Sequence, residues 1–116
     1  MHEFSLVQGL MGQLETLAAE NGAERILLVT MEIGPFSGVV VDSFRFGFEA
    51  LAPLTPLTRN ARLIVLQLPQ RYGCRDCDNE QDMDGDARPE DCPCCGSREI
   101  FPLGADDVVL RQVEME

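Results

Sequence analysis

The sequence has no long apolar run and little positive charge. Its 116 residues include nine basic residues against twenty acidic ones, which gives a formal net charge of −11. That charge repels phosphate backbones and anionic membrane surfaces. No segment approaches the roughly 20 consecutive apolar residues that a membrane-spanning helix needs. The sequence therefore argues against nucleic acid and membranes as partners.

The beginning of the chain also lacks the features of an export signal. Glu3 places an acid where a secretory signal carries basic residues, and no long apolar segment follows. We therefore expect the protein in the cytoplasm, where thiols stay reduced. Under those conditions the five cysteines indicate metal ligation before they indicate disulfides.

Hydrophobic periodicity predicts two helices and three strands. The helices are expected over 5–20 and 41–52, and the strands over 25–33, 62–68 and 107–115. Ser5 is the expected N-cap of the first helix, and Asn21-Gly22 supplies its left-handed stop. Phe44 and Phe48 share one face of the second helix and should pack on the sheet, whereas Phe46 points elsewhere.

The order of these elements predicts an α+β fold. A strand–helix–strand unit places two strands in parallel, and the last strand can return beside the second of them. We expect a small three-stranded mixed sheet covered by two helices. Residues 71–104 contain all five cysteines and few aliphatic residues, so they cannot build a hydrophobic core of their own. The predicted organisation is one domain over 1–70 plus 105–116, with 71–104 inserted before the last strand as a zinc-ribbon-like knob.

Two C-x-x-C sequences form the clearest motif, Cys74 with Cys77 and Cys92 with Cys95. This spacing lets two tight turns present four thiolates to one tetrahedral ion, and such a closed site leaves no open position for a substrate. Zinc is the expected ion, although rubredoxin-like iron sites use a similar turn and spacing alone does not separate the two. The alternative is four ordinary free thiols. Cys94 is interpreted as a bystander in the second turn.

The amino terminus offers a second set of metal ligands. His2 is the only histidine of the chain. The amine of Met1, the amide nitrogen and imidazole of His2, and the backbone amide of Glu3 can form a four-nitrogen square plane. The Glu3 carboxylate can add an axial oxygen or neutralise charge nearby. Square-planar nitrogen coordination suits Ni(II) or Cu(II) and does not suit Zn(II). The alternative is a frayed terminal residue without a role.

Several stretches together carry a resemblance to a known family. They are MHEFSL at residues 1–6, SGVV at 37–40 leading into FRFGFE at 44–49, the two C-x-x-C motifs, and Val113-Glu114. In this order, and over essentially the whole chain, they resemble the HypA/HybF family of hydrogenase maturation nickel metallochaperones.

The resemblance implies a carrier that delivers nickel during assembly of [NiFe]-hydrogenase. It implies the maturation GTPase HypB and the hydrogenase large-subunit precursor as partners. It assigns transported Ni(II) to Met1, His2 and Glu3, and structural Zn(II) to Cys74, Cys77, Cys92 and Cys95. On this basis 1–70 plus 105–116 form the nickel-binding domain and 71–104 form the zinc-binding domain.

A zinc-ribbon module that binds a protein and never carries nickel is the alternative function. Enzymatic activity is not expected, because the sole histidine is terminal and the thiols are taken by a metal. No serine or pair of carboxylates forms a recognisable catalytic arrangement in the sequence.

Overall fold

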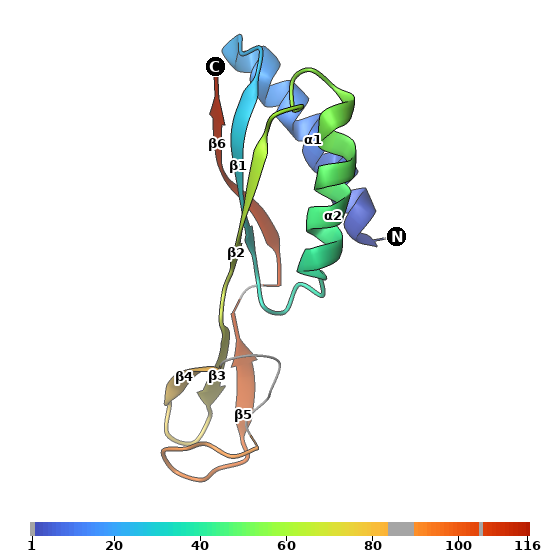
Figure 1. Cartoon of the computed structure of the whole chain (residues 1–116). Coiled ribbons are helices and arrows are strands. Elements are labelled where there is room, and N and C mark those ends of the chain that lie inside the picture. The colour runs from blue at the N-terminus through green and yellow to red at the C-terminus, as the bar shows by residue number, and fades with distance from the viewer. Residues whose placement is uncertain (1, 84–89, 105) are drawn as a thin grey trace. The chain divides into compact units, whose positions relative to one another are not determined.

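The computed structural model describes residues 2–83, 90–104 and 106–116. Within these ranges the chain forms two α-helices and six strands (Figure 1). They are α1 (His2–Asn21), β1 (Ile26–Ile33), α2 (Val41–Leu51), a short 3₁₀ helix η1 (Ala52–Leu54), β2 (Arg62–Gln67), β3 (Gln70–Cys74), β4 (Glu80–Met83), β5 (Ile100–Leu103) and β6 (Val108–Met115). In these ranges no helix has both the length and the apolar character that a bilayer crossing requires.

The chain divides into two compact units. The helical unit comprises Met1–Glu32, Val39–Leu66 and Val109–Glu116, and the cysteine unit comprises Ile33–Gly38 and Gln67–Val108. Both α-helices belong to the helical unit, whereas all five cysteines belong to the cysteine unit. The domain limits predicted from the sequence stay a prediction.

The helical unit contains a three-stranded sheet in the order β2-β1-β6. β1 and β2 run in the same direction, and both helices cover one face of the sheet (Figure 1). Arg25 and Glu116 exchange backbone hydrogen bonds of 3.1 and 3.0 Å, the reciprocal pattern of antiparallel neighbours, so β6 opposes β1. The predicted α+β class with a mixed sheet and two helices is confirmed.

The predicted position of the last strand is wrong, because β6 pairs with β1 and not with β2. β1 is the strand with the most buried side chains, among them Ile26, Val29 and Met31. A strand buried in this way is best placed at the centre, where both of its edges have a hydrogen-bonding partner. The more exposed β2 takes an edge.

Helix α1 begins at His2 and not at the predicted cap, Ser5. The first turns of α1 pack on α2 at Gly47, where an added Cβ would lie 3.2 Å from Val7 Cγ2 and 3.7 Å from Phe4 Cδ2. Val7 is fully buried there. Burial of these side chains against α2 accounts for the earlier start, since tertiary packing supplies most of the stability of a short helical segment.

The predicted end of α1 is confirmed. Gly22 has a φ of 63°, in the left-handed region that glycine adopts without strain. The N–H of Ala23 donates to the carbonyl of Ala18 at 2.8 Å, which is the closing hydrogen bond of a Schellman motif.

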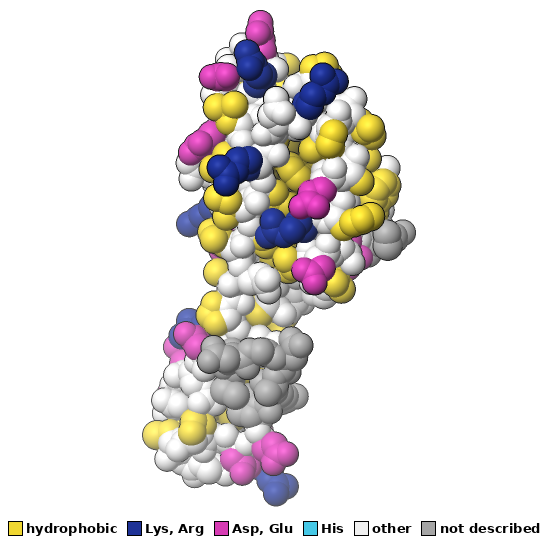
Figure 2. Space-filling view, in the orientation of Figure 1, with side chains coloured by type: hydrophobic (Ala, Val, Ile, Leu, Met, Phe, Trp, Pro, Cys, Tyr) yellow, Lys and Arg dark blue, Asp and Glu magenta, His cyan; other side chains and the backbone are white. Residues whose placement is uncertain are grey.

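The aromatic residues of α2 divide as the helical spacing predicts. Phe44 and Phe48 are buried in the core, and each contributes roughly 1.5–3 kcal/mol by leaving water. Phe46 is 72% exposed, and Leu54 in η1 is 71% exposed. Figure 2 shows hydrophobic side chains at several places on the surface of the helical unit. The aromatic residues of α2 are thus mainly core residues, with Phe46 turned to solvent.

The cysteine unit has a sheet that the sequence analysis missed, in the order β4-β3-β5 with antiparallel pairing. Tyr72 lies in its central strand opposite Gln81 and Pro102. The Tyr72 side chain is buried, and Phe36 meets its ring edge-on, with 6.0 Å between the ring centroids. This contact joins the segment that follows β1 to the sheet of the cysteine unit.

Gly73 allows β5 to pack closely on β3. A Cβ at Gly73 would lie 2.7 Å from Phe101 Cζ and 3.1 Å from Leu103 Cδ1. We expect Gly73→Ala to destabilise the cysteine unit by about 1–3 kcal/mol, the usual range for overpacking. Tyr72 is the only tyrosine and the chain has no tryptophan, so tyrosine fluorescence during thermal unfolding reports on this unit.

The matched control for Gly73→Ala is Gly12→Ala in α1, where nothing lies within 4 Å of the added Cβ. That change should stabilise α1 by up to about 1 kcal/mol through helix propensity. An unchanged tyrosine transition in Gly73→Ala would contradict the close packing of Phe101 on β3.

Candidate metal centres

The first cysteine pair lies in a tight turn that follows β3. The N–H of Asp78 donates to the carbonyl of Cys74 at 3.0 Å, and the N–H of Cys74 donates to the carbonyl of Asn79 at 2.9 Å. Asp78 has a φ of 58°, a left-handed conformation that aspartate tolerates better than most residues. The turn places the thiols of Cys74 and Cys77 within 4.8 Å of each other.

The second pair lies in a turn with the same hydrogen bonds. The N–H of Gly96 donates to the carbonyl of Cys92 at 2.8 Å, and the N–H of Cys92 donates to the carbonyl of Ser97 at 2.7 Å. Gly96 has a φ of 76° and takes the place of Asp78 in the first turn. Each C-x-x-C sequence is therefore closed in the same way, by a left-handed residue directly after its second cysteine.

Contacts between the two turns hold them together. The N–H of Arg75 donates to the carbonyl of Glu99 at 2.9 Å. The Ser97 hydroxyl donates to the carboxylate of Asp76 and accepts the N–H of Glu99 at 3.0 Å. The Arg75 guanidinium lies over the ring of Phe101, 5.1 Å from its centroid. The turns are thus positioned by protein contacts as well as by whatever the thiols bind.

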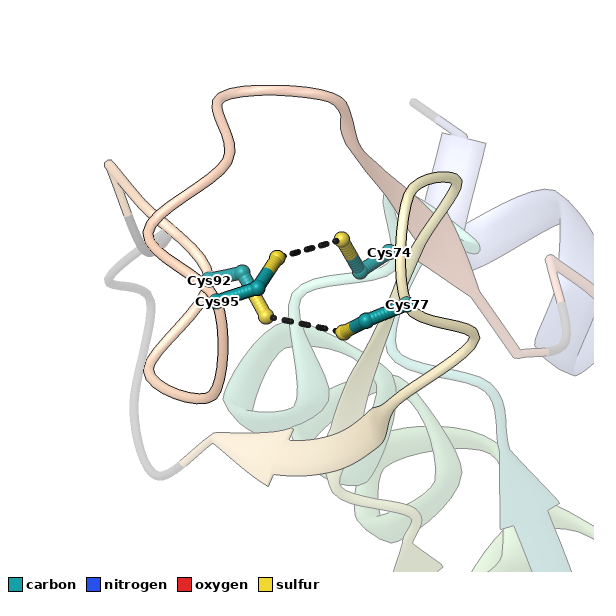
Figure 3. Close-up of side chains that lie close together, drawn as sticks. All are labelled: Cys74, Cys77, Cys92 and Cys95. Carbon is teal, nitrogen blue, oxygen red and sulfur yellow. Dashed lines mark hydrogen bonds between the residues drawn. The ribbon is translucent and has the colours of Figure 1, made fainter.

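The four thiols of the C-x-x-C pairs point toward one another (Figure 3). Their sulfur atoms all lie within 4.8 Å of one another, and the Cys74–Cys95 and Cys77–Cys92 pairs are each 3.6 Å apart. A tetrahedral ion with metal–sulfur bonds of about 2.3 Å requires sulfur–sulfur distances of about 3.8 Å. The sulfur geometry therefore fits a closed tetrahedral site. The fifth thiol, Cys94, is exposed and is not part of the group.

Backbone amides affect the pKa of one thiol in each cysteine pair, Cys92 and Cys77. The backbone N–H of Cys95 has the largest effect on the Cys92 thiol. Together with the N–H of Cys94 it outweighs the effect of burial and lowers the pKa of Cys92 to about 7. The N–H of Asn79 acts in the same direction on Cys77, but burial and the neighbouring thiols outweigh it and raise the pKa of Cys77. Thiols with a raised pKa become thiolates at neutral pH when a cation replaces their protons, so metal binding here releases protons.

Of the predicted nickel ligands, Met1 and the side chain of His2 lie outside the described residues. The backbone of His2 begins α1. Glu3 is described, and its carboxylate Oε1 accepts a hydrogen bond from the N–H of Val40 at 3.1 Å. The structure thus places the Glu3 side chain at the N-terminus of α2, a contact that the sequence analysis missed.

The chain is similar to known proteins over essentially its full length. A family model described as "Hydrogenase/urease nickel incorporation, metallochaperone, hypA" matches residues 1–115. A hydrogenase maturation factor HypA from Azotobacter chroococcum mcd 1 is 36% identical over 116 residues, which is 100% of both chains. The resemblance inferred from the sequence motifs is confirmed.

Two solved structures share the fold. A solution structure of HypA protein aligns with a TM-score of 0.69 and 25% identity over 100% of this chain and 97% of that chain. The solution structure of the Ni metallochaperone HypA from Helicobacter pylori aligns with a TM-score of 0.65 and 24% identity over 97% and 96% of the two chains. Because the family model, the full-length relative and the fold agree, this chain belongs to the HypA family.

Proposed function

We propose that the protein is a nickel metallochaperone that binds Ni(II) at its amino terminus and delivers it during maturation of [NiFe]-hydrogenase. The observation that carries this proposal is the match of the HypA family model to residues 1–115. The model description names hydrogenase and urease, and the relatives are named hydrogenase maturation factors. Hydrogenase is therefore the proposed recipient of the nickel.

The structural ion is proposed to be Zn(II), held by Cys74, Cys77, Cys92 and Cys95. Four thiolates occupy all four coordination positions of a tetrahedral zinc ion. A zinc ion in this site therefore stays bound and contributes free energy to folding, and it has no open position for catalysis. The buried apolar cluster beside it is small and consists of Cys74, Cys92 and Ile100, with Cys77 packed against it. Zinc would therefore provide much of the order of the cysteine unit.

The transported ion is proposed to bind the amine of Met1, the imidazole of His2 and the backbone nitrogens of His2 and Glu3. Support comes from the start of α1 at His2. The first four N–H groups of a helix have no carbonyl partner within that helix. Nickel bound through the amide nitrogens of His2 and Glu3 therefore breaks no hydrogen bond inside α1. An acceptor protein can replace exposed nitrogen ligands one at a time, whereas closed thiolates resist such exchange.

The proposed partners are the maturation GTPase HypB and the hydrogenase large-subunit precursor. The family is one of maturation factors, and we propose that the chain itself catalyses no reaction. We place the protein in the cytoplasm, because a thiolate metal site requires reduced cysteines and all five cysteines are free.

The proposal is tested in a host that makes [NiFe]-hydrogenase and lacks this chain. We expect the native chain to restore the nickel content of the large subunit. A chain with extra residues before Met1 should fail to do so, because the terminal amine is no longer at Met1. Both forms should carry equal zinc. Full nickel insertion with the extended chain would contradict amino-terminal nickel delivery and favour a zinc-ribbon interaction module.

A further inference from the structure

We propose that the side chain of Glu3 is a positioning residue that caps helix α2 and thereby holds the first turn of α1 in place. This role differs from the axial nickel ligand that the sequence indicates for the same carboxylate. Its first part, the cap on α2, stands on the contacts of the described residues alone. Its second part, the effect on nickel binding, rests on the proposed function.

Helix α2 starts without a cap from its own sequence. Its N-cap residue is Val40, whose backbone is extended and whose side chain has no atom that accepts a hydrogen bond. Val40 already accepts the first intrahelical bond, from the N–H of Phe44 at 3.0 Å. The Glu3 carboxylate accepts the N–H of Val40 at 3.1 Å. In a capping box, a glutamate or glutamine at the third helical position accepts this N–H, and α2 has Ser43 there. Glu3 therefore supplies from α1 the carboxylate half of a capping box that the sequence of α2 lacks.

The residues that follow Glu3 fix the same end of α1 on α2. Phe4 and Val7 approach α2 where Gly47 leaves room, within 3.7 and 3.2 Å of the position that a Cβ would take. The two helices run in the same direction, so their amino-terminal halves lie beside each other (Figure 1). Among the described side chains of α1, that of Glu3 lies first in the chain, and it also contacts the start of α2.

This arrangement prepares the terminus for a metal. Unrestrained chain ends fray, and ordering them during binding reduces affinity. The side chain of Glu3 is tied to α2, so its backbone nitrogen is held in the first turn of α1. Loss of the carboxylate should therefore weaken nickel binding without changing the atoms that bind nickel.

Hydrogen exchange of nickel-free protein tests the cap. Glu3→Gln keeps an oxygen acceptor at the same reach, whereas Glu3→Ala removes it. We expect the Val40 amide to exchange about fivefold faster in Glu3→Ala, because loss of a typical helix cap shifts the equilibrium between the closed and the open helix end about fivefold. In Glu3→Gln the amide should exchange at nearly the native rate. Glu15→Ala, at an exposed glutamate of the same helix, is the matched control and should leave that rate unchanged. Equal rates in native protein and Glu3→Ala would overturn the proposal.

Nickel titration tests the second part. In Glu3→Ala we expect Ni(II) to bind about fivefold more weakly, with the visible absorption band of square-planar Ni(II) unchanged. Glu3→Gln should match the native protein in both respects. A shifted band in either variant would identify the carboxylate as a direct ligand and overturn the positioning role. Absence of nickel binding in the native protein would overturn the proposed nickel site, while the exchange result for Val40 would still decide the cap.

Discussion

Replacing His2 by alanine should abolish stoichiometric Ni(II) binding and leave the ion of the four thiols in place. In the proposed nickel site the imidazole closes one of the chelate rings at the amino terminus, and the chain has no other histidine to replace it. Removal of a metal's outer-shell partner already lowers affinity roughly 10–100-fold, so loss of a direct ligand should exceed that. Equilibrium dialysis of zinc-loaded protein with a native amino terminus measures the effect.

The control for His2→Ala is Glu15→Ala, which changes an exposed side chain of the same helix and should bind nickel as the native protein does. Zinc content, measured in the same samples, should be equal in all three proteins. Nickel bound at full stoichiometry and native affinity by His2→Ala would contradict the amino-terminal site.

Replacing Cys92 by serine should remove the structural ion and unfold the cysteine unit while the helical unit stays folded. Structural zinc sites contribute apparent binding free energies of about 10–16 kcal/mol in zinc-finger peptides, far more than the small apolar cluster of this unit can supply. Two optical signals separate the units. Tyr72 fluorescence reports on the cysteine unit, and helical circular dichroism reports on α1 and α2, which belong to the helical unit.

Cys94→Ser is the matched control for Cys92→Ser, since it makes the same chemical change in the same turn at an exposed thiol outside the cluster. It should keep zinc and the native Tyr72 signal. The double variant with both substitutions excludes replacement of the lost ligand by Cys94. Retention of zinc in the double variant, or its loss in Cys94→Ser, would contradict the assignment of the four ligands.

The elements of the helical unit were largely predictable because their signals are local. Apolar spacing defined α1, α2 and the strands, and Gly22 marked the end of α1. The order of the strands was not predictable in the same way, since pairing depends on which strand is most buried. The early start of α1 was also missed, because it depends on Gly47, a residue distant in sequence.

The sheet of the cysteine unit was missed for a different reason. β3 buries only two alternating side chains, Tyr72 and Cys74, and the sequence of β4 is mainly polar. Alternation over so few residues is too short for periodicity to identify a strand.

The grouping of the four thiols could be predicted, because C-x-x-C spacing and the geometry of a tetrahedral ion are both local constraints. The contact of Ser97 with Asp76 and that of Val40 with Glu3 could not, since each joins residues far apart in the sequence. For the second contact the sequence of α2 shows only that Ser43 stands where a capping box has a glutamate or glutamine, which does not identify Glu3 as the acceptor.

X-ray absorption at the nickel and zinc edges of native-ended protein loaded with both metals tests the central claim most directly. We expect nickel surrounded by nitrogen donors without sulfur, and zinc surrounded by four sulfur atoms at about 2.3 Å. Nickel with sulfur neighbours would contradict the separation of a transported ion at the amino terminus from a structural ion among the cysteines.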